Sequence, residues 1–119
     1  MSAEDLGRKF PTPDVEFGLG AQLSLDLNAF IEEHCAPRAE TFVAFDANIP
    51  LIADRDTIVD WYLNSVLVSA ARVTITAGQL HGRTSYTMNL SQFDRVRPQL
   101  AQVGSTSPGT AITMGARGS

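Results

Sequence analysis

The sequence contains a single cysteine, Cys35, in 119 residues. One cysteine cannot form an internal disulfide, and the chain has no Cys-x-x-Cys pair for zinc. No apolar run approaches the roughly 18 residues that a membrane-spanning helix requires. The acidic start, residues 1–5, lacks the basic and apolar regions of a secretory signal. We therefore expect a soluble, cytoplasmic protein with no cofactor, no metal and no membrane contact.

Lysine is also scarce, since Lys9 stands against eight arginines. This skew is typical of a GC-rich coding genome and indicates a bacterial or bacteriophage source. Residues 1–60 hold twelve acids and four bases, a formal charge of −8, whereas residues 61–119 carry +4. The isoelectric point of about 4.9 and the absence of aromatics between the arginines argue against a nucleic-acid partner. A charge difference between the halves of a chain is compatible with protein–protein contact, or with two halves that interleave in one fold.

Hydrophobic residues make up 44% of the chain and charged residues 18%, the balance of one small globular domain. The ends are rich in glycine, proline, serine and threonine, and we interpret residues 1–20 and 105–119 as extended arms. Residues 21–104 then form the core. The predicted fold class is α+β: an antiparallel sheet packed against two or three helices.

The strongest strand signal lies in residues 72–90. Apolar side chains alternate with polar ones on both sides of a short loop that contains Gly78 and Gly82, which predicts a β-hairpin. Ile75 and Tyr86 are expected to share its buried face. Residues 39–46 predict one more strand.

Three further segments favour helices. Residues 21–35 predict a short strand and then a helix capped by Asn28. A second helix is expected to begin at residues 54–57 and run through residue 68; because residues 66–68 are β-prone, a strand there is the alternative. The stripe of Phe93, Val96, Leu100 and Val103 predicts an amphipathic helix that ends at residue 104, with Pro98 as a kink.

Few residues offer catalytic chemistry, and we predict no catalytic residue and no enzyme. The neighbours His34 and Cys35 sit beside two glutamates that would raise a thiol pKa, so we expect Cys35 to be dispensable. The histidines lack metal-ligand spacing. The best candidate ligand pocket lies around Asp60, Trp61 and Tyr62, which would make the chain a small enzyme or ligand-binding domain.

The leading functional hypothesis is a non-enzymatic structural or assembly subunit of a larger complex, such as a component of a phage or virion-type particle. The arms hold too few apolar groups to order themselves against one domain, because ordering costs about 1–2 kcal/mol per residue. The partner is then a second copy of the chain or another protein subunit. The alternative is a small acidic binding or inhibitory module, similar in role to immunity proteins or chaperones. The residues predicted to bind a partner are Phe10, Phe17, Arg83, Arg95, Arg97, Ile112 and Met114.

Overall fold

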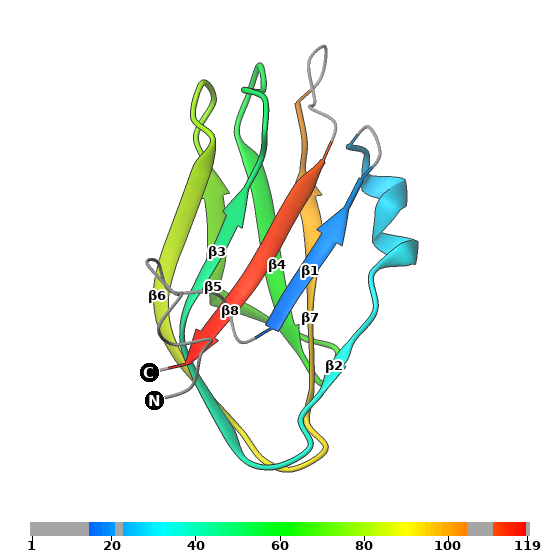
Figure 1. Cartoon of the computed structure of the whole chain (residues 1–119), viewed down its shortest axis with the longest axis vertical. Coiled ribbons are helices and arrows are strands. Elements are labelled where there is room, and N and C mark those ends of the chain that lie inside the picture. The colour runs from blue at the N-terminus through cyan, green and yellow to red at the C-terminus, as the bar shows by residue number, and fades with distance from the viewer. Residues whose placement is uncertain (1–14, 21–22, 105–110, 119) are drawn as a thin grey trace, which may run out of the picture.

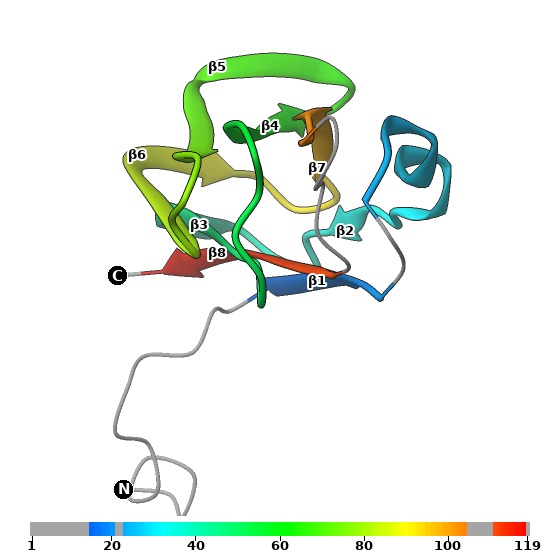
Figure 2. The same cartoon turned by 90° about the horizontal axis from the view of Figure 1, so that it is seen from above.

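The computed structural model describes residues 15–20, 23–104 and 111–118. They form two four-stranded antiparallel sheets that face one another (Figures 1 and 2). The first sheet has the strand order β1 (Val15–Leu19), β8 (Ile112–Gly118), β3 (Glu40–Asn48), β6 (His81–Leu90). The second has the order β2 (His34–Cys35), β7 (Arg95–Gln102), β4 (Thr57–Leu63), β5 (Val66–Ile75). The described helix is one short 3-10 turn, η1 (Leu25–Phe30), so the α+β prediction is wrong and the fold is a β-sandwich.

Aromatic rings fill the space between the sheets. Trp61 of β4 is fully buried, and its ring centroid lies 5.0 Å from that of Phe45 on β3. Phe17 of β1 meets the same indole edge-on at 5.9 Å. Aromatic pairs of this kind contribute about 0.5–1.5 kcal/mol beyond their buried area. The core therefore ties β1, β3 and β4 together across the two sheets.

The two strands predicted over residues 72–90 are present, but the prediction that they pair as a hairpin is wrong. Both strands exist and Val73 and Ile75 are buried as the alternation requires, but β5 pairs with β4 while β6 pairs with β3. The chain thus crosses from the second sheet to the first between the two runs. The crossing is close: the Thr84 hydroxyl donates to the Arg72 carbonyl, and a Cβ on Gly82 would lie 2.3 Å from the Thr74 carbonyl oxygen.

The helix expected from residues 54–57 through 68 is instead the hairpin of β4 and β5. Asn64 and Ser65 form its two-residue turn with φ angles of 50° and 67°, the left-handed geometry that matches strand twist. Apolar side chains lie on both faces of β4, so the segment resembled a helix that is apolar all round. The strand alternative for residues 66–68 is confirmed.

The amphipathic helix expected up to residue 104 is β7. Val96, Pro98 and Leu100 all point inward at the spacing of two that a strand requires. The spacing of Val96 and Leu100 satisfies both periods, which explains the error. Pro98, expected as a helix kink, lies opposite Trp61 in the register of β4 and β7.

Residues 21–35 contain less regular structure than expected. Ser24, not Asn28, caps η1: its hydroxyl accepts from the Asp26 amide at 3.2 Å. The Asn28 side chain instead accepts from the Leu100 amide at 2.7 Å and donates to the Leu100 carbonyl at 2.9 Å. Through these two hydrogen bonds, the Asn28 side chain satisfies main-chain groups of β7 that a neighbouring strand would otherwise bind. The strand predicted over residues 39–46 is confirmed as β3.

The described parts of the two expected arms are strands. β8 lies between β1 and β3 in the first sheet, and β1 pairs with β8 from Val15 opposite Ala116 to Leu19 opposite Ile112. Small, turn-prone residues dominate both segments, which hid the alternation of Ile112, Met114 and Ala116 on the inner face. Residues 1–14, 105–110 and 119 of the expected arms lie outside the described residues.

Candidate functional site

The loops that connect the strands gather at two opposite ends of the sandwich (Figure 1). We call the end that carries residues 49–56 and 76–80 the upper end, and the end that carries residues 36–39, 64–65 and 91–94 the lower end. Each end brings together loops from both sheets.

Two loops of the upper end are joined through their main chains. The Ile49 amide donates to the Leu80 carbonyl at 2.9 Å, and the Gly78 amide donates to the Ala53 carbonyl at 3.3 Å. Ile49 and Ala53 are buried and anchor the longer loop to the core. The conformations of residues 49–53 and 78–80 are therefore coupled.

These coupled loops expose large aliphatic side chains. Leu51 and Ile52 are each 59% exposed, and Leu80 on the neighbouring loop is 47% exposed. We refer to these three residues as the aliphatic loop cluster. An open hollow of about 370 Å³ adjoins the same loop; its lining residues are Asn48, Ile49, Pro50, Ala111, Ile112 and Thr113. The upper end thus offers apolar surface and an apolar recess beside it.

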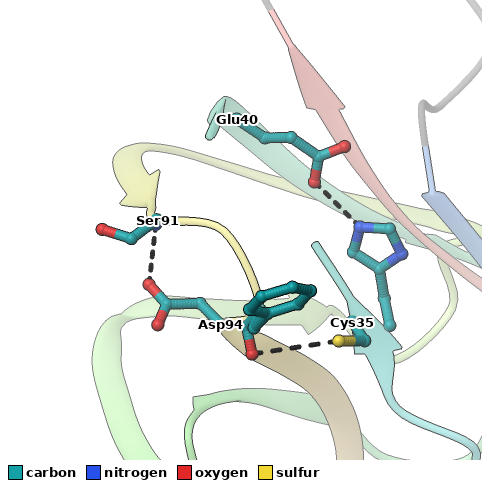
Figure 3. A network of polar contacts seen from close by, with 6 residues as sticks. Cys35, Glu40, Ser91 and Asp94 are labelled. Atoms are coloured by element: carbon teal, nitrogen blue, oxygen red, sulfur yellow. Dashed lines mark hydrogen bonds and ion pairs between the residues drawn. The ribbon is translucent and has the colours of Figure 1, made fainter. Parts of the chain in front are cut away.

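The lower end is held by polar contacts (Figure 3). The Asp94 carboxylate accepts from the Ser91 amide at 2.8 Å and from the Asn64 side chain at 3.1 Å. These two hydrogen bonds hold the pKa of Asp94 below its ordinary value because they favour the charged form, and the bond from the Ser91 amide has the larger effect. Asn64 also accepts from the Arg95 amide at 2.9 Å. One carboxylate and one amide therefore join the β4–β5 turn to the β6–β7 loop.

His34 and Cys35 lie next to this network but do not act on one another. Consecutive strand residues point to opposite faces. His34 Nε2 lies 2.8 Å from Glu40 Oε2, whereas Cys35 Sγ is exposed and lies 3.9 Å from the Phe93 carbonyl oxygen. This geometry provides no base for the thiol, and the dispensability of Cys35 stays a prediction.

The expected pocket at Asp60, Trp61 and Tyr62 is not assembled. Trp61 points into the core, so Asp60 and Tyr62 face the other side of the sheet. Both carboxylate oxygens of Asp60 are bound by Arg72, with Nε to Oδ1 at 2.7 Å and Nη2 to Oδ2 at 2.9 Å. The hydrogen bonds and charge of Asp60 raise the pKa of Arg72. Asp60 is thus engaged in a structural pair.

The residues predicted to bind a partner are dispersed. Arg83 lies on β6 of the first sheet, whereas Arg95 and Arg97 lie on β7 of the second, so no single basic face forms. Arg97 Nη2 donates to the Asn28 carbonyl at 3.0 Å. Phe10 lies outside the described residues.

Two of the predicted anchors are used inside the fold. Ile112 and Met114 are buried on β8, and Phe17 is half-buried against Trp61. These side chains contact the core of their own chain, which leaves none of the three fully available to a partner.

Sequence reasoning missed the aliphatic loop cluster and a second buried ion pair. Arg117 Nε donates to Asp46 Oδ2 at 2.7 Å between β8 and β3. Nothing local in the sequence relates these two residues, which are 71 positions apart. Leu51 and Ile52 left a readable signal, because two large aliphatics directly follow Pro50 in a segment bounded by turn residues.

Comparison with known proteins gives only a distant likeness in fold. No protein-family model matches the sequence, and no curated protein matches it. A solved structure described as the native structure of a family 35 carbohydrate binding module from Clostridium thermocellum matches with a TM-score of 0.45 and 11% identity. The match covers 71% of this chain and 66% of that chain. At these values the likeness carries no conclusion about function.

Among the described residues, no helix has the length and apolar character to cross a membrane. Within the same residues, no three histidine, cysteine, aspartate or glutamate side chains are grouped to hold a metal ion.

Proposed function

We propose that this chain is a non-catalytic subunit of a larger protein assembly and that the aliphatic loop cluster is its contact surface. The observation that carries the proposal is the exposure of Leu51, Ile52 and Leu80 on two loops that are hydrogen-bonded to each other. Single exposed apolar residues are normal on protein surfaces, but several that gather at one place mark an interaction site.

The charged side chains that pair within the chain also support this proposal. Asp60 with Arg72, Asp46 with Arg117 and His34 with Glu40 form pairs within the chain. Their side chains contribute to the sandwich and are not arranged around a reacting centre. A partner that covers the cluster would gain about 1.5–3 kcal/mol for each large aliphatic side chain removed from water.

The location of such an assembly follows only from the sequence. The cytoplasm or a virion-type particle stays the predicted site, and a second copy of the chain is the first partner to test.

The decisive experiment compares the mass of the protein in solution with and without the cluster. Size-exclusion chromatography with light scattering is run on the wild type and on a variant with Leu51→Ser, Ile52→Ser and Leu80→Ser. We expect the wild type to exceed the 12.8 kDa of one chain and the variant to approach it. Since all three side chains are exposed, the melting temperature should stay nearly unchanged.

The matched control is Val66→Ser with Leu67→Ser on β5, where the side chains are 66% and 44% exposed. It removes two exposed aliphatic side chains outside the cluster and should leave the mass unchanged. For heteromeric assembly, the proteins that co-purify with each variant are compared quantitatively. The proposal is rejected if neither the mass nor the co-purifying proteins depend on the cluster.

A further inference from the structure

In the described part of the chain, β1 is an edge strand of the first sheet. Among the described residues, β8 is the only strand that pairs with β1, over five residues from Val15 to Leu19. In an antiparallel strand, every second residue directs its amide and carbonyl groups away from the paired neighbour. Part of the β1 main chain therefore points outward, where an extended segment can pair with it.

This edge faces a hollow. A space of about 240 Å³ is lined by Glu16, Phe17 and Gly18 of β1 on one side and by Ile31 and Glu32 on the other. The second group belongs to the chain that leads from η1 to β2, which lies beside β1 in both views (Figures 1 and 2). The free edge is thus one wall of a groove between the two sheets.

Two apolar side chains, Phe17 and Ile31, are among the residues that line the groove. Ile31 is buried, and Phe17 is half-buried with its ring edge-on to Trp61 at 5.9 Å. At Gly18 an added Cβ would meet no atom within 4 Å, so the outer face of β1 is uncovered at that position. An incoming strand would place alternate side chains against Phe17 and Ile31 and the others toward solvent.

The groove is also acidic. Glu16 and Glu32 are exposed on its two walls, and no cation in the described part of the chain pairs with either carboxylate. The neighbouring Glu33 differs, because Arg95 lies 3.9 Å from its carboxylate. Two unpaired carboxylates on either side of a free strand edge favour a basic occupant.

We propose that β1 binds an extended basic segment of a partner protein by strand addition. The partner main chain pairs with the free edge of β1, its apolar side chains contact Phe17 and Ile31, and its lysines or arginines contact Glu16 and Glu32. The five residues of β1 correspond to about 17 Å of extended chain. This site is separate from the aliphatic loop cluster and does not depend on it.

The charge argues against two other occupants. A second copy of β1 would bring a further Glu16 into a groove that already holds two carboxylates, and like charges across a strand pair are destabilising. A nucleic acid would present phosphates to the same carboxylates.

The test uses the full chain and a capped peptide with three Lys-Val repeats as the probe. Isothermal titration calorimetry measures its affinity, and the amide resonances of the protein locate its site. We expect binding at low ionic strength, with the largest shifts along β1, from Val15 to Leu19. A peptide with Glu-Val repeats should not bind.

Two variants and one modified peptide separate charge from main-chain pairing. Glu16→Gln with Glu32→Gln should weaken binding about tenfold, as expected for two lost exposed ion pairs. The control, Asp26→Asn with Glu33→Gln, removes the same formal charge nearby and should have a much smaller effect. N-methylation of alternate peptide amides should abolish binding, because it blocks strand pairing without changing charge.

Several results would overturn this inference: no binding of the Lys-Val peptide, equal binding of the N-methylated peptide, or shifts that map away from β1. The serine variant of the aliphatic loop cluster should bind the peptide as the wild type does. Loss of assembly and loss of peptide binding are therefore independent outcomes.

Discussion

At the upper and lower ends of the sandwich, the loops are joined to one another in different ways. At the lower end, Ala36 and Asp94 are joined through their main chains at 2.8 Å, and Asn64 and Asp94 through their side chains. At the upper end, main-chain contacts also join two loops, but Leu51 and Ile52 extend into solvent. The lower end uses its polar side chains to fix the loops and exposes one aromatic ring, Phe93, whereas the upper end exposes three aliphatic side chains.

This difference separates stability from binding. A polar side chain that joins two loops contributes to folding, and its removal should lower the free energy of unfolding. An aliphatic side chain that remains in water contributes little to folding until a partner covers it. Substitutions at the two ends should therefore affect different measurements.

The largest loss of stability is expected from a substitution at Gly82, where β6 begins next to the upper end. Gly82→Ala would place a Cβ 2.3 Å from the Thr74 carbonyl oxygen, and a backbone atom cannot move aside as a flexible side chain can. We expect a loss of about 3 kcal/mol in the free energy of unfolding, the upper part of the usual range for overpacking. Urea denaturation followed by tryptophan fluorescence measures this loss.

Gly18→Ala provides the control, because an added Cβ there meets no atom within 4 Å. Its unfolding curve should match that of the wild type to within about 0.5 kcal/mol. Equal curves for Gly82→Ala and the wild type would show that the close crossing between β5 and β6 does not stabilise the upper end.

Two kinds of strand could be predicted from the sequence. The runs of β5 and β6 are readable because polar and apolar side chains alternate along them, and β3 is readable because Phe42, Val43 and Phe45 favour strands. The errors fall where this contrast is missing. β4 is apolar on both faces, and β7 combines a spacing of four between Val96 and Leu100 with a proline.

Strand pairing could not be predicted, because it depends on contacts between segments far apart in the chain. No residue pattern within 72–90 indicates that β5 and β6 belong to opposite sheets. The turn at Asn64 and Ser65 was a local signal for the true pairing of β4 and β5. Of the candidate surfaces, Leu51 and Ile52 are readable next to Pro50, whereas the groove beside β1 exists only once the two sheets are assembled.

A smaller loss of stability is expected in the lower end from Asn64→Ala. The substitution removes the hydrogen bonds to Asp94 and Arg95 and places alanine at a φ angle of 50°. We expect a loss of about 1–2 kcal/mol in the free energy of unfolding, with no change in the mass of the assembly. Chemical denaturation and light scattering measure the two quantities.

Asn64→Gly separates the two causes, because glycine accepts the positive φ but lacks the amide. If the side-chain bonds matter, Asn64→Gly should also be destabilised. A glycine variant as stable as the wild type would assign the whole effect to backbone conformation.

The smallest effect concerns the acid dependence of the lower end. The hydrogen bonds from Ser91 and Asn64 lower the pKa of Asp94 in the folded chain. The unfolded chain therefore takes up the proton first as the pH falls, and the stability that Asp94 contributes is complete above its unfolded pKa of about 3.9. That contribution is lost as the pH falls from there through the lower folded pKa.

Asp94→Asn tests this prediction, because it keeps an oxygen that can accept from the Ser91 amide but cannot titrate. The melting temperature of the variant should therefore fall less steeply with pH below about pH 4 than that of the wild type. Asp26→Asn, at an exposed position in the first turn of η1, removes one carboxylate elsewhere and should retain the wild-type slope. Parallel slopes for Asp94→Asn and the wild type would mean that the lower end owes its acid sensitivity to other groups.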